Sequence, residues 1–112
     1  MLEKLSLPAI AGEQMQAGTL ADVARIEGVA VRVACLKGAF AFHAHDGEDE
    51  LLNVLDGTTT LETQQGGIAL SAGDAVLVPA GQRHRTVTSD RATVLFVHPD
   101  RIRLPGAAVP VA

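Results

Sequence analysis

The segment of residues 38–57, GAFAFHAHDGEDELLNVLDG, decides both the fold class and the candidate site. His43 and His45 lie two residues apart in this segment. On a β-strand that spacing places both imidazoles on one face, with Cα atoms about 6.6 Å apart, and such a pair can chelate one ion. The pair alone is weak evidence for a metal, because histidines on strands more often face solvent.

Two further ligand candidates follow along the chain. An acidic turn ends at Glu50, which opens the apolar run LLNVL and adds a carboxylate to the two imidazoles. Glu48 and Asp49 are competing carboxylates, but neither is followed directly by an alternating strand, so we expect them to solvate the loop. His84 comes after an expected type I turn at 78–81, Val-Pro-Ala-Gly, and begins the alternating run that continues RTVT. We therefore expect His43, His45, Glu50 and His84 to converge inside one barrel.

The chain from residue 29 onward predicts an all-β domain. Short apolar runs alternate with Gly, Asp and Pro at intervals of roughly 8–12 residues, which is typical of a sandwich or barrel. Asp56-Gly57 predicts one tight hairpin and Gln65-Gly66-Gly67 a second, so the strands should pair antiparallel. The eight expected strands suit a jelly roll, and they are 29–37, 39–44, 51–55, 58–63, 68–71, 75–78, 84–88 and 93–98.

The two ends of the chain are less regular than the barrel at 29–99. Residues 19–26, within the N-terminal segment 1–28, fit either a short capped helix or an edge strand. Pro8 and Gly12 indicate that the chain before residues 19–26 is irregular. Residues 100–112, rich in Pro, Gly, Ala and Val, have no pattern and are expected to form a frayed or surface-laid tail.

Two motifs resemble those of the cupin family. The first has HxH, four residues, Glu, six residues and Gly, at His43, His45, Glu50 and Gly57. The second has Gly, five residues, Pro, one residue, Gly, two residues and His, and it spans residues 73–84. There are two departures: Gly38 is one residue closer to His43 than in the commonest pattern, and Thr88 replaces an Asn that often closes the second motif. The second departure removes a side-chain amide from the barrel mouth.

This resemblance to the small single-domain cupins, often labelled mannose-6-phosphate-isomerase-like, implies a fold and a site. The fold is a double-stranded β-helix, or jelly-roll β-barrel. His43, His45, Glu50 and His84 would bind one divalent ion, which is Fe, Mn, Ni, Cu, Co or Zn. Three neutral imidazoles and one carboxylate leave open positions on an octahedral ion.

The function implied is a small metal-dependent enzyme, dioxygenase-like or isomerase-like, that acts on a small organic ligand. The sequence offers no catalytic group beyond the ligands. One alternative is a metal-dependent ligand-binding or sensing module without turnover, and another is a metal that serves only as a structural staple.

The strand pattern also predicts the orientation or burial of several other residues. Arg83 and Arg85 flank His84 and should point away from it into solvent, although Arg83 lies near enough to the turn to meet a substrate carboxylate. His98 should be a surface or strand-end histidine, with a position lining the pocket as the alternative, and Cys35 a small buried hydrophobe. The side chains expected to face the core make an apolar pocket, and they are Ala41, Leu52, Val54 and Val76.

Composition limits the partners and the compartment. The net charge of −4, without a basic cluster, disfavours nucleic acid. A single cysteine and the lack of an apolar signal core favour the cytoplasm, and no run approaches the roughly 20 apolar residues of a membrane span. A domain of this size has a small free energy of unfolding, and its apolar runs place apolar side chains on both faces of the sheet. We therefore expect a homodimer in which the two sheets pack face to face.

Overall fold

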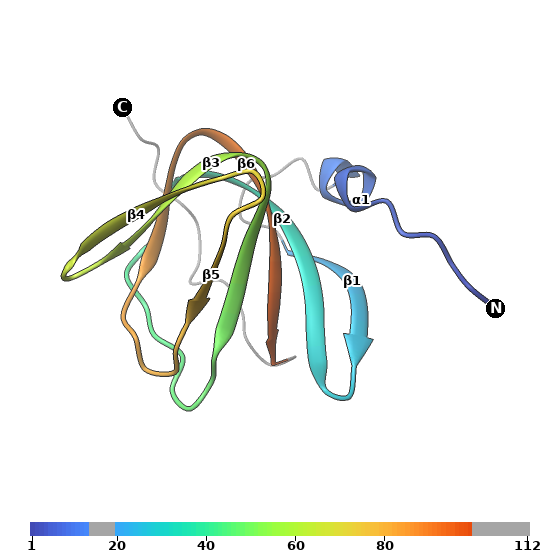
Figure 1. Cartoon of the computed structure of the whole chain (residues 1–112), viewed down its shortest axis with the longest axis horizontal. Helices are drawn as coiled ribbons and strands as arrows, with labels where there is room; N and C mark the ends of the chain where they lie inside the picture. Colours follow the sequence, from blue (N-terminus) through green and yellow to red (C-terminus); the bar gives the residue numbers. More distant parts are fainter. Residues whose placement is uncertain (14–19, 100–112) are drawn as a thin grey trace.

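The computed structural model describes residues 1–13 and 20–99 of the 112-residue chain. Strands dominate this part of the chain, as the all-β prediction requires (Figure 1). No helix among the described residues has the length and apolar character needed to cross a membrane. The elements in chain order are α1 (Leu7–Glu13), β1 (Ala21–Ile26), β2 (Val29–Ala39), β3 (Glu50–Thr63), β4 (Gly66–Ser71), β5 (Ala75–Val78) and β6 (Arg85–Pro99).

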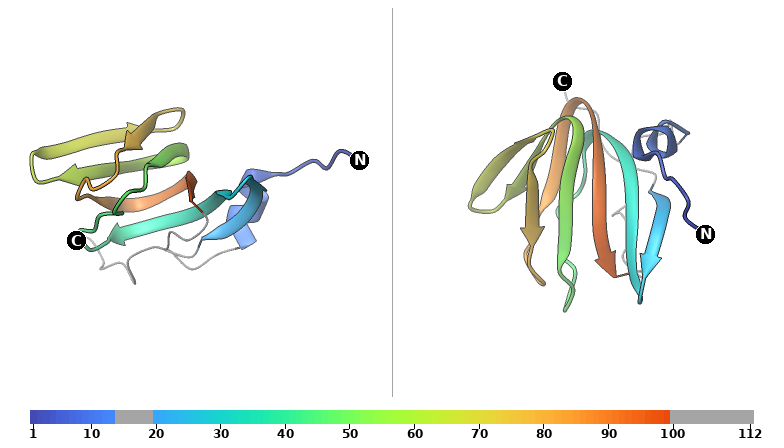
Figure 2. Two further views of the ribbon diagram at one scale, coloured as in Figure 1. Left: turned by 90° about the horizontal axis from the view of Figure 1, so that it is seen from below. Right: turned by 45° about the vertical axis from the view of Figure 1, so that its right-hand side comes forward.

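The strands form two layers that share their longest members. All pairs are antiparallel, in the order β1-β2-β6-β3-β4, and β5 pairs with the start of β3. One layer runs β5-β3-β6-β2-β1, and the other joins β4 to the second half of β3 and the first half of β6. β3 and β6 arch together where they pass from one layer to the other (Figures 1 and 2). The chain is thus a double-stranded β-helix, as predicted.

The arch explains why the expected hairpin at Asp56-Gly57 is wrong. The register of β3 against β6 shifts between Val54 and Asp56 and again between Gly57 and Thr60, so the strand bends and continues instead of reversing. Gly57 has a φ of 79°, and a Cβ on it would meet the carbonyl oxygen of Arg91. The dipeptide therefore allows a close backbone approach at the bend, which requires glycine as a hairpin does.

Three other boundaries differ from the prediction. The expected strands 84–88 and 93–98 are one continuous strand, β6, which bends with β3. The expected strand 39–44 does not form: β2 ends at Ala39, and beyond it only His43 makes an isolated bridge, to His84. The turn after β5 lies one residue later than expected, since the Gln82 N–H donates to the Pro79 carbonyl at 3.1 Å.

The hairpin between β3 and β4 is confirmed, with Thr63 paired to Gly66. Of the two alternatives for 19–26, the edge strand is correct for the described residues: β1 spans Ala21–Ile26 and pairs with β2. The irregular chain expected around Pro8 and Gly12 is wrong, because α1 spans both residues. Pro8 lies in the first turn of α1, where a missing N–H leaves no hydrogen bond unmade. Residues 100–112, expected to be a tail, lie outside the described residues.

Two apolar clusters lie on opposite faces of the β5-β3-β6-β2-β1 layer. The inner cluster fills the space between the layers and includes Leu36, Phe40, Leu52, Val54 and Phe96. The outer one joins α1 to the sheet around Val33. Of the expected core residues, Leu52 and Val54 are buried and Val76 is half-buried against the inner cluster, but Ala41 is exposed because residue 41 lies beyond β2. Cys35 is buried, as expected.

Candidate metal centre

Backbone hydrogen bonds fix the loop that carries the first two histidines. His43 and His84 exchange both backbone bonds, His43 N to His84 O at 2.9 Å and His84 N to His43 O at 2.8 Å. The Gly81 N–H donates to the His45 carbonyl at 3.0 Å. The Ala80 N–H donates to Asp49 Oδ1 at 2.8 Å, so this carboxylate, expected only to solvate the loop, ties it to the turn after β5. The two motifs are therefore held together by main-chain contacts.

The side chains of His43, His45 and His84 converge. One ring nitrogen from each lies within 4.8 Å of the others, and these residues are the group that could hold a metal ion among the described residues. Their ring centroids are 4.3 Å apart for His43 and His84, 5.0 Å for His43 and His45, and 5.7 Å for His45 and His84. The structure therefore brings together the three histidines that the spacing singled out.

Two of the histidines are held in the tautomer that a metal needs. His43 Nδ1 lies 3.0 Å from the Ala41 carbonyl oxygen, and His84 Nδ1 lies 2.8 Å from the Gln82 carbonyl oxygen. A carbonyl can only accept, so each Nδ1 carries the proton and each Nε2 presents a lone pair. Backbone carbonyls commonly orient metal-binding histidines in this way.

Glu50, the first residue of β3, borders the histidine cluster with one oxygen. Its Oε1 lies 3.6 Å from Nε2 of His84 and 3.8 Å from Nε2 of His45, distances too long for hydrogen bonds but suited to two ligands facing one position. Its other oxygen, Oε2, lies 2.7 Å from His98 Nδ1. Glu50 is therefore placed as the sequence predicts, and its role as a metal ligand stays a prediction.

The electrostatic environment keeps Glu50 ionised. Burial raises the pKa of its carboxyl, but the contacts with His84 and His98 outweigh burial, and the pKa falls to about 2. Burial lowers the pKa of both His43 and His45, which favours their neutral, metal-binding forms. Burial also opposes the charge on His84, but its contacts with Glu50 and the Gln82 carbonyl prevail and raise its pKa.

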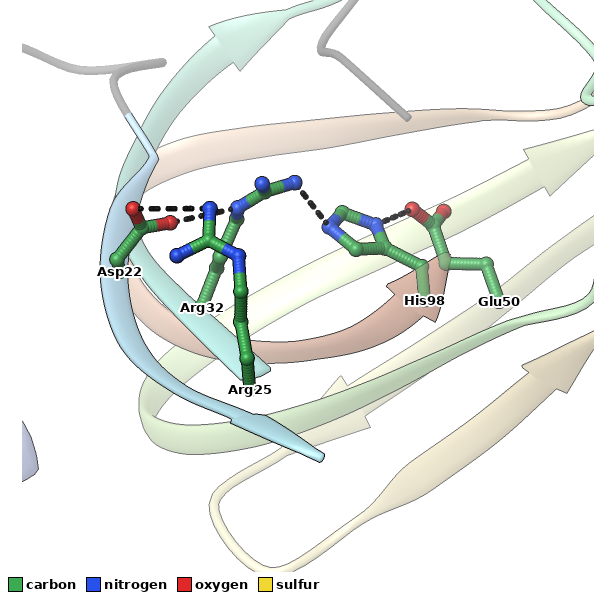
Figure 3. A network of polar contacts seen from close by, with 5 residues as sticks. All are labelled: Asp22, Arg25, Arg32, Glu50 and His98. Carbon is green, nitrogen blue, oxygen red and sulfur yellow. Dashed lines mark hydrogen bonds and ion pairs between the residues drawn. The ribbon is translucent and has the colours of Figure 1, made fainter. Parts of the chain in front are cut away.

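His98 lies at the end of β6, as expected, but the expectation that it is a surface residue is wrong. His98 is 2% exposed and lies between Glu50 and Arg32, whose Nη1 is 3.1 Å from His98 Nε2 (Figure 3). Alternation along β6 could have placed it, since His98 is in phase with the buried residues Val94 and Phe96. Arg32, 5% exposed on β2, was missed because the apolar run around it predicts a buried strand but indicates no partner for a buried charge.

Arg83 is exposed and Arg85 is half-exposed, but neither arginine is simply solvated. Arg85 pairs with Glu62 at 2.8 Å and its guanidinium lies 4.7 Å from the Phe42 ring centroid. The Arg83 guanidinium lies 5.9 Å from the same centroid. Thr88, at the position where the resemblance has Asn, is fully buried and its hydroxyl lies 2.7 Å from that of Thr59. Thr88 therefore links the adjacent strands β3 and β6 within one layer, and its burial keeps it out of an open barrel mouth.

The free space beside the cluster is small. It measures about 10 Å³, which is roughly one water molecule, so it suits an ion or a water rather than an organic molecule. Apart from the candidate ligands and Thr86 its walls are apolar, as expected, but only Leu52 of the four residues expected there lines it. The lining residues are Phe40, Leu52, Phe96, Thr86, His43, Glu50 and His84.

The donor set fits a divalent transition metal. Imidazole nitrogens suit Zn, Cu, Fe and Ni, and one carboxylate adds a hard oxygen donor. Backbone carbonyls orient the ring nitrogens, and His98 orients the carboxylate. Metal sites commonly hold their ligands through such neighbouring hydrogen bonds. The residues present therefore agree with the kind of ion that the sequence motifs imply.

Comparison with known proteins agrees with this geometry. The family model described as Cupin domain matches residues 33–98, more than half of the chain. The uncharacterized protein YdbB of Bacillus subtilis is 32% identical over 98 residues, 87% of each chain. A cupin-2 domain-containing protein from Shewanella frigidimarina superposes with a TM-score of 0.82 at 20% identity, over 85% of this chain and 93% of that one. A double-stranded β-helix protein from Klebsiella pneumoniae superposes with a TM-score of 0.72 at 18% identity, over 97% and 95%. The chain belongs to the cupin family.

Proposed function

We propose that this cupin binds one divalent transition-metal ion through His43, His45, His84 and Glu50, and that it is an enzyme acting on a small organic ligand at that ion. The observation that carries the proposal is the convergence of three imidazole nitrogens within 4.8 Å, with Glu50 Oε1 facing two of them. When bound, the metal supplies Lewis acidity or redox chemistry to a ligand that coordinates it directly.

The protein's own residues prepare the site in three ways. The Ala41 and Gln82 carbonyls hold His43 and His84 with Nε2 free of a proton. Glu50 stays ionised and reduces the charge of a bound dication by one. Phe40, Leu52 and Phe96 exclude bulk water from the buried side, so that the charges act in a low dielectric.

The same walls define the class of ligand. Because the free space beside the candidate ligands is only about 10 Å³, a substrate reaches the ion from the side on which His43 and His45 are half-exposed. The cavity offers one hydroxyl, from Thr86, besides the candidate ligands. A small organic acid, diketone or thiol that uses its own donor atoms to bind the metal fits these limits, whereas a large polar substrate does not.

One observation favours a second candidate, a metal-dependent ligand-binding or sensing module without turnover. The residues that line the cavity include no acid or base apart from the candidate ligands, so the barrel supplies no separate group for proton transfer. Both candidates require the same metal centre and differ only in whether the bound ligand changes chemically.

An assay on metal-loaded protein separates the two. Protein loaded in turn with Fe(II), Mn(II), Co(II), Ni(II), Cu(II) and Zn(II) is mixed with a panel of small acids, diketones and thiols. Calorimetry follows binding, while oxygen uptake and chromatography follow turnover. Turnover with one metal, lost in His84→Ala, supports the enzyme. Metal-dependent binding without turnover supports the module, and neither binding nor turnover would contradict both.

A further inference from the structure

A chain of polar side chains runs across the inside of the barrel from its edge strand to the candidate metal centre (Figure 3). Asp22 on β1 accepts from Arg32 Nε on β2 at 2.9 Å, Arg32 Nη1 lies 3.1 Å from His98 Nε2 on β6, and His98 Nδ1 lies 2.7 Å from Glu50 Oε2 on β3. The exposed fractions of Arg32, His98 and Glu50 are 5%, 2% and 4%. Four strands thus contribute one residue each.

The chemistry of arginine fixes the direction of these hydrogen bonds. A guanidinium has only donors, so His98 Nε2 must accept from Arg32 with its lone pair. The proton of the neutral ring is then on Nδ1, which donates to Glu50 Oε2. Arg32 therefore decides which nitrogen of His98 faces Glu50 as a donor.

The bond to Oε2 has a consequence for the other oxygen of Glu50. With Oε2 engaged by His98, Oε1 is the oxygen that faces His45 and His84, at 3.8 and 3.6 Å. We infer that Arg32 and His98 are positioning residues, which act in series to present Oε1 of Glu50 as a single, oriented ligand to the metal. This inference rests on the proposed function, because it assigns a role toward the ion proposed there.

The surroundings argue against a purely structural role. Arg32 and His98 occupy positions that alternate with apolar residues on the inner face, Ala30 and Ala34 on β2 and Phe96 on β6. A buried polar group at such a position contributes little net stability compared with a well-packed apolar one, since its desolvation offsets its contacts. A role in orienting Glu50 gives the buried polar pair a function that apolar residues cannot supply.

Three substitutions test the inference through metal affinity. His98→Leu removes the donor to Glu50, and Arg32→Met keeps much of the aliphatic stem but frees His98 to change tautomer. His98→Asn retains an N–H close to the position of Nδ1. Co(II) affinity, measured by competition with a chelator, is expected to fall about 10–100-fold in the Leu and Met variants and less in the Asn variant, the usual range for loss of an outer-shell partner. Arg85→Met, which breaks the ion pair with Glu62 instead, should bind as the wild type does.

Two spectroscopic readouts distinguish positioning from general destabilisation. In metal-free wild type, nitrogen-15 NMR should show His98 protonated on Nδ1 alone, and Arg32→Met should mix the two tautomers. The visible spectrum of bound Co(II) should change in His98→Leu, because the orientation of one ligand changes, and remain as in wild type in Arg85→Met.

Each failure has a separate meaning. Wild type that binds no Co(II) would contradict the proposed function, while the NMR spectrum would still test the Arg32–His98–Glu50 arrangement. Wild-type affinity and an unchanged Co(II) spectrum in folded His98→Leu would overturn the positioning role. A wild-type His98 protonated on Nε2 would overturn it even if the variants failed to fold.

Discussion

His98 Nδ1 donates to Glu50 Oε2 across 2.7 Å, joining the end of β6 to the start of β3 inside the barrel. The two residues are 48 positions apart, and neither side chain is more than a few percent exposed. Loss of either partner leaves the other as a buried polar group without this bond, which costs more than the bond itself contributes. A residue of the candidate metal centre thus also takes part in the contact that holds the end of β6 to the start of β3.

Two glycines with the same φ, one at the bend of β3 and one after β5, should differ in their tolerance of alanine. Gly57 and Gly81 both have a φ of 79°, but a Cβ on Gly57 would meet the Arg91 backbone, whereas one on Gly81 meets nothing within 4 Å. Gly81→Ala should cost about 1–2 kcal/mol of unfolding free energy for the left-handed conformation alone. Gly57→Ala adds a backbone clash and should cost about 2–5 kcal/mol. Urea unfolding measures both, and equal losses would mean that the close approach at the bend is not rigid.

Metal affinity should depend on pH in a defined order. The raised pKa of His84 means that a proton competes with the metal there first, at and above the ordinary imidazole value of about 6.5. The lowered pKa values of His43 and His45 mean that their protons compete only below that value. Calorimetry in buffers of different ionisation enthalpy should show about one proton released per ion near neutral pH and more under acidic conditions. Affinity that is flat from about pH 7.5 to 4.5 would show that histidines are not the ligands.

The metal-free barrel should lose stability in acid partly through Glu50. Its folded pKa of about 2 lies below the ordinary 4.5, so its contribution is complete above pH 4.5 and is lost as the pH falls toward 2. The urea midpoint should fall across that window, and Glu50→Gln should fall less. Glu62→Gln, which changes a half-exposed carboxylate in the Arg85 pair, should keep the wild-type fall. The same fall in Glu50→Gln as in wild type would contradict the assignment.

We propose that the protein is a homodimer that pairs through its outer sheet face. Strand register aligns Leu77, Leu51, Val97 and Val31 in one row across β5, β3, β6 and β2. The row faces away from the inner core, and Leu77 is 59% exposed. A contiguous aliphatic row of this kind marks an interaction surface, and a second copy offers the same row.

Light scattering at micromolar concentration should therefore give the mass of two chains. Leu77→Glu should shift the mass toward one chain by placing a charge in the row. Ile68→Glu is the matched control, because Ile68 is 55% exposed but lies on β4, outside the row. A monomeric wild type, or equal effects of the two substitutions, would exclude this interface.

The sequence was sufficient to predict the fold class and the cluster of candidate ligands. His43, His45, Glu50 and His84 have spacings that depend on local strand and turn geometry, and local geometry can be predicted from residues close in sequence. His98 could have been recognised as buried from the alternation along its strand, but its position beside Pro99 favoured a strand end. His98 does lie at the strand end, but the alternation, and not the end position, predicts its burial.

Other features depend on contacts that no local pattern contains. Asp56-Gly57 has the composition of a hairpin, and only the approach of Arg91, far along the chain, makes it a bend in a continuous strand. Arg32 is buried because Asp22 and His98 meet it from different strands. Such positions require the three-dimensional arrangement, since their partners are set by strand order rather than by spacing.

The central claim is tested most directly by elemental analysis of protein purified without a metal-affinity column. We expect one divalent transition-metal ion per chain in the wild type and in Asp49→Ala, whose carboxylate bonds to the Ala80 N–H. Glu50→Ala and His84→Ala should retain little or no metal while remaining folded by circular dichroism. Wild type that stays metal-free even after incubation with Fe(II), Ni(II) or Zn(II), or full occupancy in both Glu50→Ala and His84→Ala, would contradict the account.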